Sequence, residues 1–131
     1  MIYEFCAENV TLLEKAMQAG ARRIELCDNL AVGGTTPSYG VTKAAVELAA
    51  NYDTTIMTMI RPRGGDFVYN DLEIAIMLED IRLTAQAGSQ GVVFGALTAD
   101  KKLDKANLEK LIAASKGMEI VFHMAFDELS D

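Results

Sequence analysis

Residues Thr55-Ile-Met-Thr-Met-Ile60 run directly into Arg61-Pro-Arg-Gly-Gly-Asp66, and this junction decides the fold. A run of apolar and β-branched residues predicts a buried strand, and the loop that follows is dense in charge and glycine. In α/β proteins a strand that ends in polar side chains presents them at the carboxyl edge of a parallel sheet. The junction therefore predicts such a sheet with a functional site at that edge.

Extended and helical patterns alternate on both sides of this junction. Strands are predicted over residues 2–6, 23–27, 55–60, 91–95 and 119–123, and helices over residues 10–19, 40–50, 70–87 and 104–117. Thr11 with Glu14, and Asn70 with Glu73, have the spacing of capping boxes at helix starts. Strands that alternate with helices pair in parallel through helical crossovers, so the predicted fold class is α/β.

Five strands and four helices fit two architectures. One is a complete doubly wound sheet, and the other is the first part of a (β/α)8 TIM barrel, which takes about 250 residues in full. The chain ends soon after its fifth strand, whereas a complete doubly wound sheet would normally cover that strand with a helix. We therefore favour the barrel, and expect residues 1–131 to be a single domain that forms its N-terminal portion.

The composition excludes several functional classes. The net charge of −7 argues against a nucleic-acid partner, and no apolar run approaches the ~20 residues that a membrane span needs. The N-terminus, Met1-Ile-Tyr-Glu-Phe-Cys6, lacks the basic region and cleavage site of a secretory signal, which favours a cytoplasmic protein. The two cysteines, Cys6 and Cys27, are then expected to be reduced thiols.

Two Glu-x-Cys tripeptides, Glu4-Phe-Cys6 and Glu25-Leu-Cys27, lie on the first two predicted strands. Side chains alternate along a strand, so each Glu and Cys share one face, and neighbouring strands lie about 4.8 Å apart. Two adjacent thiolates suit Cu(I), with His123 as a ligand from the far side. In the alternative interpretation the cysteines are small buried hydrophobes and the glutamates pair with arginines in a structural network.

The loop Arg61-Pro-Arg-Gly-Gly-Asp66 combines two guanidinium groups with a glycine pair that permits close backbone approach. Such a loop suits a phosphate or carboxylate, unless the arginines only neutralise nearby carboxylates. For a catalytic site we predict that the substrate is bound by Glu4, Arg61, Arg63, Gly64, Gly65 and Asp66.

His123 is the only histidine of the chain, and it ends the fifth predicted strand with Asp127 four residues on. It is either a packed residue or a functional one, acting as a ligand or a general base. In a catalytic site, Glu25 or His123 would be the acid or base and Asp127 would orient the histidine.

Together these segments resemble the copper homeostasis protein CutC family. The resemblance rests on the Glu-x-Cys start, Ala19-Gly-Ala-Arg-Arg-Ile-Glu-Leu-Cys27, Gly33-Gly-Thr-Thr-Pro-Ser38, Met59-Ile-Arg-Pro-Arg-Gly-Gly-Asp-Phe-Val-Tyr69 and Phe122-His-Met-Ala-Phe-Asp127. It implies a cytoplasmic TIM barrel that often self-associates and handles copper, with Cys6 and Cys27 as Cu(I) ligands. Members of that family are longer and continue through further strands.

The leading hypothesis is thus a cytoplasmic copper homeostasis protein that binds Cu(I) through Cys6 and Cys27. The alternative is a TIM-barrel enzyme that acts on a small anionic metabolite, phosphorylated or carboxylated. A purely structural role is the third possibility. We expect copper or a small anion as the ligand and a homo-oligomer, with neither nucleic acid nor membrane as a partner.

Overall fold

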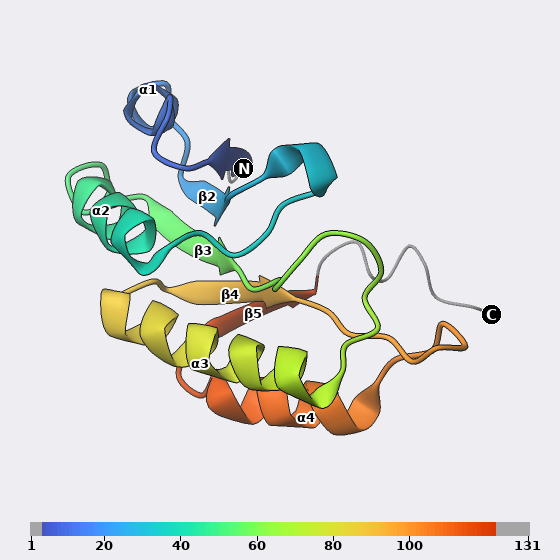
Figure 1. Ribbon diagram of the computed structural model, residues 1–131. Helices are drawn as coiled ribbons and strands as arrows, with labels where there is room; N and C mark the ends of the chain where they lie inside the picture. The colour runs from blue at the N-terminus through green and yellow to red at the C-terminus, as the bar shows by residue number, and fades with distance from the viewer. Residues whose placement is uncertain (1–3, 123–131) are drawn as a thin grey trace.

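The computed structural model describes residues 4–122, which form a parallel sheet with helices packed against it (Figure 1). Its strands are β1 (Glu4–Glu8), β2 (Arg23–Cys27), β3 (Thr55–Met59), β4 (Gly91–Phe94) and β5 (Glu119–Phe122). They are hydrogen-bonded in the order β1-β2-β3-β4-β5, with every pair parallel. A doubly wound sheet reverses its strand order at a switch point, so this uninterrupted order is that of a partial (β/α)8 barrel.

The helices lie along one side of this sheet in Figure 1. They are α1 (Leu13–Gln18), α2 (Tyr39–Ala49), α3 (Asp71–Ala87) and α4 (Lys105–Ala114), with a short 3-10 helix, η1 (Leu30–Val32), after β2. Within residues 4–122, none of the helices combines the length and apolar character needed to cross a membrane.

The two faces of the sheet bury different residues. On the helix side, Ile24, Leu26 and Ile56 pack with α1 and α2, and Val92 and Phe94 pack with α3 and α4. The opposite face, which we call the interior face, carries a separate cluster of Cys27, Met57, Met59 and Val93. This alternation along each strand is what places the thiol of Cys27 away from the helices.

An ion pair shows that the interior face is concave. Arg23 on β2 donates from Nη1 to Glu119 Oε1 on β5 at 2.7 Å, although β3 and β4 lie between these strands in the sheet. Both side chains belong to the interior face, because side chains two or four residues apart along a strand share a face, and Arg23 lies four residues before Cys27 and Glu119 two residues before Val121. A flat sheet would keep strands three places apart at more than 14 Å, by the roughly 4.8 Å spacing of neighbours. The sheet therefore curves as a barrel does.

The predicted capping box at Thr11 and Glu14 is wrong. Helix α1 begins only at Leu13, and its N-cap position is Leu12, which has a left-handed φ of 61° and caps no backbone group. Asn9, also left-handed, accepts a hydrogen bond from the Val10 amide and turns the chain before Thr11 is reached. Glu14 instead accepts a hydrogen bond from the Tyr52 hydroxyl at 2.9 Å. A tertiary contact thus replaces the local one.

The capping box at Asn70 and Glu73 is confirmed. The Asn70 side chain accepts from the Glu73 amide at 2.8 Å, and Glu73 accepts from the Asn70 amide at 3.0 Å. These two bonds start the 17-residue helix α3, the longest in the part of the chain that the structure describes. The helix in turn supplies Ile74, Met77 and Ile81 to the core on the helix side.

Replacing the cap residue should therefore lower stability measurably. We expect Asn70→Ala to reduce the free energy of unfolding by about 1 kcal/mol, because the first turn of α3 loses an acceptor for one of its free amides. Asn70→Asp keeps an acceptor oxygen and is the matched control, with a change of less than about 0.5 kcal/mol. Urea unfolding monitored by circular dichroism measures both, and equal losses in the two variants would show that the cap is not the cause.

Candidate functional site

The two cysteines lie on adjacent strands of the interior face but not directly opposite each other. In the β1–β2 register Cys6 stands opposite Glu25, and Cys27 stands opposite Glu8. The cysteines are therefore diagonal neighbours, with Cα atoms roughly 8 Å apart by ordinary strand dimensions. That separation exceeds the reach of a disulfide without backbone movement. Glu8 was not predicted as a site residue, although its position two residues after Cys6 places it on the same face.

Cys27 is the buried member of the pair, with 2% of its surface exposed. Its thiol points to the Ala7 carbonyl oxygen at 3.6 Å, and the loop after β2 covers it. A side-chain carbon on Gly34 would lie only 3.3 Å from Cys27 Sγ and 3.5 Å from Met59 Cε, so the backbone of Gly34 rests on both sulfur side chains. Gly34 has a left-handed φ of 98°, which suits glycine at this contact.

The electrostatic surroundings of Cys27 favour its protonated form. Burial raises the pKa of the thiol to about 11, with further contributions from Cys6, Glu8, Glu25 and Asp28. A thiol with so high a pKa is a poor nucleophile at neutral pH. The same negative surroundings attract a cation, which can replace the thiol proton.

Cys6 is the exposed member of the pair. It lines an open groove of about 280 Å³ along β1, together with Phe5, Ala7, Glu8, Thr11, Leu12 and Leu30. Solvent therefore reaches one thiol directly, while the other lies beneath the loop after β2. The pair combines an accessible sulfur with a shielded one.

Arg61, predicted to bind an anion, is almost fully buried, with 3% of its surface exposed. Its guanidinium donates to three backbone carbonyls: Val32 at 2.6 Å and Gly34 at 3.0 Å through Nη1, and Gly65 at 2.8 Å through Nη2. It also lies 4.7 Å from the centre of the Phe67 ring. Arg61 thus ties the loop after β2 to the loop after β3, and so holds Gly34 over Cys27.

Arg63 is also engaged within the chain. It donates from Nε to Glu73 Oε2 at 2.6 Å, and its Nη2 lies 3.0 Å from Asp66 Oδ1. Further bonds go to the carbonyls of Gly64, Asp66 and Val68, and the guanidinium lies 5.1 Å from the centre of the Tyr69 ring. Hydrogen bonding from Arg63 is the main reason that the pKa of Glu73 falls below its ordinary value. Both predicted anion-binding arginines are therefore engaged in loop structure, with Arg61 joining two loops and Arg63 organising its own.

The glycine pair of this loop, Gly64 and Gly65, contributes to the contact between the loop after β3 and the loop after β2. A side-chain carbon on Gly64 would lie 3.0 Å from Val32 Cβ, so Val32 of the loop after β2 occupies the space that the missing side chain leaves. Gly65 has a left-handed φ of 92° and offers its carbonyl to Arg61. The close backbone approach expected at these glycines is made by the neighbouring loop.

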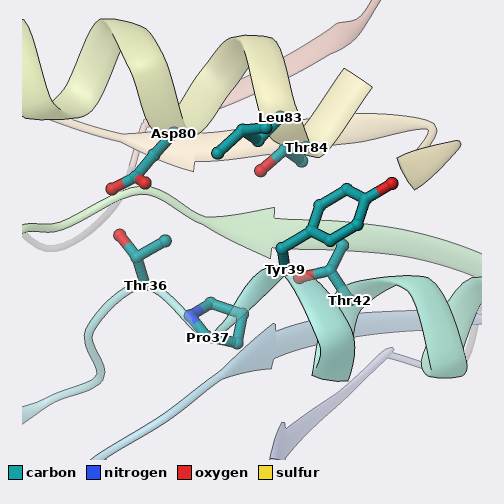
Figure 2. A pocket seen from close by; sticks show the side chains of 7 residues that line it. All are labelled: Thr36, Pro37, Tyr39, Thr42, Asp80, Leu83 and Thr84. Carbon is teal, nitrogen blue, oxygen red and sulfur yellow. The ribbon is translucent and has the colours of Figure 1, made fainter. Parts of the chain in front are cut away.

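A second, smaller hollow lies on the helix side, between the start of α2 and α3 (Figure 2). Its volume is about 20 Å³, which suits a single water molecule. It is lined by Thr36, Pro37, Tyr39, Thr42, Asp80, Leu83 and Thr84. Burial, and then the charge of Glu79, raise the pKa of Asp80 above its ordinary value. None of these residues belongs to the interior face that carries the cysteines.

Some predicted site residues cannot be placed. His123 and Asp127 lie outside the described residues, and Glu4 is described only as the first backbone position of β1. Glu25 lies on the interior face opposite Cys6. Between residues 4 and 122, no group of three or more His, Cys, Asp and Glu side chains is arranged to hold a metal ion. The sulfur-containing side chains that meet at Cys27 are the distinctive chemistry of this face.

A partial (β/α)8 barrel with thiols on its interior face is the class of protein that the fold and site define. The profile of the CutC family matches residues 1–131, and the chain belongs to that family. Relatives named as family protein CutC are 56% identical over 129 residues in Streptococcus pyogenes and 54% identical over 130 residues in Enterococcus faecalis. The chain is covered over 98% and 99% in these comparisons, but it spans only 62% of each relative.

A solved structure agrees with the fold. A Streptococcus agalactiae protein, whose name proposes a copper homeostasis role as CutC, superposes with a TM-score of 0.95 at 50% identity. The match covers 99% of this chain and 62% of that one. A Vibrio vulnificus relative is 47% identical, and the chain spans 51% of its length. The partial barrel described above is thus the fold of the corresponding part of a CutC protein.

Proposed function

We propose that this chain binds Cu(I) through Cys6 and Cys27 as part of a copper homeostasis function in the cytoplasm. The observation that supports it is the placement of an exposed and a buried thiol as diagonal neighbours on one concave face. Thiolates are soft ligands that select Cu(I), and a metal ion bridges two sulfurs that a disulfide does not reach. Reduced thiols of this kind fit a reducing compartment.

The negative surroundings of the pair support a cation as the ligand. Glu8 and Glu25 flank the cysteines in register, and Asp28 follows Cys27 directly. Each of these carboxylates raises the pKa of the Cys27 thiol, which is the expected effect of negative charge on a group that must become an anion. Once the two thiols are ionised, a monovalent cation between them offsets one of their two negative charges and so lowers the repulsion from these carboxylates. An anionic ligand at the same place would increase that repulsion.

The alternative, an enzyme acting on a small anionic metabolite, has less support. It requires Arg61 and Arg63 to present guanidinium groups to a ligand, whereas these groups hydrogen-bond to backbone carbonyls and to Glu73. The high pKa of Cys27 also disfavours a role as a catalytic nucleophile. We therefore favour binding and transfer of copper over catalysis.

Substitution of the thiols tests the proposal. We expect Cys27→Ser and Cys6→Ser each to weaken Cu(I) binding by roughly a hundredfold or more, because a hydroxyl is a hard, neutral donor. Competition against a Cu(I) chelator of known affinity measures this, and Cys27→Ala controls for the burial of a new hydroxyl group. Circular dichroism checks that each variant is folded. Unchanged affinity in the double variant Cys6→Ser with Cys27→Ser would refute the proposal.

A further inference from the structure

We infer that Met59 is a third sulfur ligand of the copper site, completing a trigonal set with Cys6 and Cys27. The inference rests on the proposed Cu(I) binding and adds to it a residue to which neither the motifs nor the family assignment gives a role.

Three observations place Met59 beside Cys27. Both residues belong to the sulfur-rich cluster of the interior face. The β2–β3 register pairs Leu26 with Thr58, so the next positions, Cys27 and Met59, stand side by side at the ends of their strands. Cys27 Sγ and Met59 Cε lie within 3.3 Å and 3.5 Å of the same point, the place where a Gly34 side chain would begin. The terminal methyl carbon of Met59, which is bonded to the thioether sulfur, and the Cys27 thiol therefore both lie against Gly34.

The other methionine of the cluster is turned away from this space. Met57 lies one layer further from the carboxyl edge, opposite Glu25. A side-chain carbon on Gly91 would lie only 2.5 Å from Met57 Sδ, so the thioether of Met57 fills the place above Gly91 on β4. Met57 is fully buried and Met59 is 7% exposed, as expected if Met59 lies closer to the opening of the interior face. The two methionines thus form a matched pair, with only one of them at Cys27.

The chemistry of the site favours a neutral third donor. Two thiolates and one Cu(I) ion carry a net charge of −1, and Glu8, Glu25 and Asp28 already surround Cys27. A further anionic ligand would add repulsion, whereas a thioether adds a soft metal–sulfur bond without charge. Burial in an apolar cluster suits it as well, since a methionine costs nothing to desolvate when the site is empty.

The test compares Met59→Leu with Met57→Leu, two substitutions that conserve volume in the same cluster. We expect Met59→Leu to weaken Cu(I) binding about tenfold, and Met57→Leu to leave the affinity within about twofold of wild type. X-ray absorption at the copper edge should count three sulfur neighbours in the wild type and in Met57→Leu, and two in Met59→Leu.

A second measurement needs no copper. With methionine methyl groups labelled by carbon-13, one resonance should shift strongly on addition of Ag(I), and that resonance should be missing from Met59→Leu. A wild type that binds neither metal overturns the proposed function and the inference together. A wild type that binds Cu(I) with two sulfur neighbours, and the same affinity in Met59→Leu, overturns the inference alone.

Discussion

Replacing Arg61 by methionine should destabilise the fold by about 3–5 kcal/mol, among the largest effects of any single change in this chain. The buried guanidinium is the donor for the carbonyls of Val32, Gly34 and Gly65. Loss of the guanidinium leaves the buried Gly34 carbonyl with its full desolvation cost, about 1–3 kcal/mol, and the part-buried carbonyls of Val32 and Gly65 with a smaller cost. Relief of the buried charge offsets part of this loss, so the estimate lies below the simple sum.

The measurement is urea unfolding together with a thermal melt, in which the midpoint should fall by about 10 °C or more. Arg63→Met is the matched control, because Arg63 belongs to the same loop but its side chain is 36% exposed. Its loss should cost only about 1 kcal/mol. Equal effects of the two substitutions would contradict the special role assigned to Arg61.

The same substitution has a chemical consequence that stability alone does not report. Arg61 holds the Gly34 carbonyl, and Gly34 covers the Cys27 thiol. In a Cys6→Ser background, Arg61→Met should therefore increase the rate at which Cys27 reacts with a thiol reagent, under conditions where the protein remains folded. Arg61→Lys, which keeps the charge but lacks the planar fork, should give an intermediate rate.

Much of the fold could be predicted from the sequence because its signals are local. The strand patterns, the Asn70 capping box and the α/β alternation each depend on neighbours within a few residues. The Thr11 prediction failed where a tertiary contact, from Tyr52 to Glu14, competed with the local one. The choice of a barrel over a doubly wound sheet was right, and the observed strand order supplies the stronger reason.

The site was harder to predict because its decisive contacts join distant loops. Spacing correctly placed Cys6, Glu25 and Cys27 on strands with shared side-chain parity. It did not reveal that the cysteines are diagonal, since register depends on how β1 and β2 align in space. It also could not show that the Arg61 guanidinium would face the carbonyls of Val32 and Gly34, 29 and 27 residues away in the chain. A charged loop has the same sequence pattern whether its side chains bind a ligand or a neighbouring loop.

Copper affinity should rise steeply with pH, and this is the largest effect we expect on function. The pKa of Cys27 is raised to about 11 from an ordinary value of 9.0, so the thiol of the metal-free protein is protonated at neutral pH. Cu(I) binds the thiolate and displaces that proton to solvent. At pH values below this pKa, each unit of increase in pH therefore strengthens binding about tenfold through Cys27 alone. Between pH 6 and pH 9 the increase is about a thousandfold.

The shifted pKa makes a sharper prediction above pH 9. An ordinary thiol would be largely ionised there, and the affinity would level off, whereas the Cys27 contribution should continue to rise towards pH 11. Glu8→Gln removes one of the charges that raise this pKa, so its affinity should level off at a lower pH. Competition titrations with a chelator calibrated at each pH give the slope, and proton release in weak buffer gives the stoichiometry. A wild-type affinity that is already constant between pH 7 and pH 9 would mean that copper does not displace the Cys27 proton, and the buried thiol would then not be a ligand.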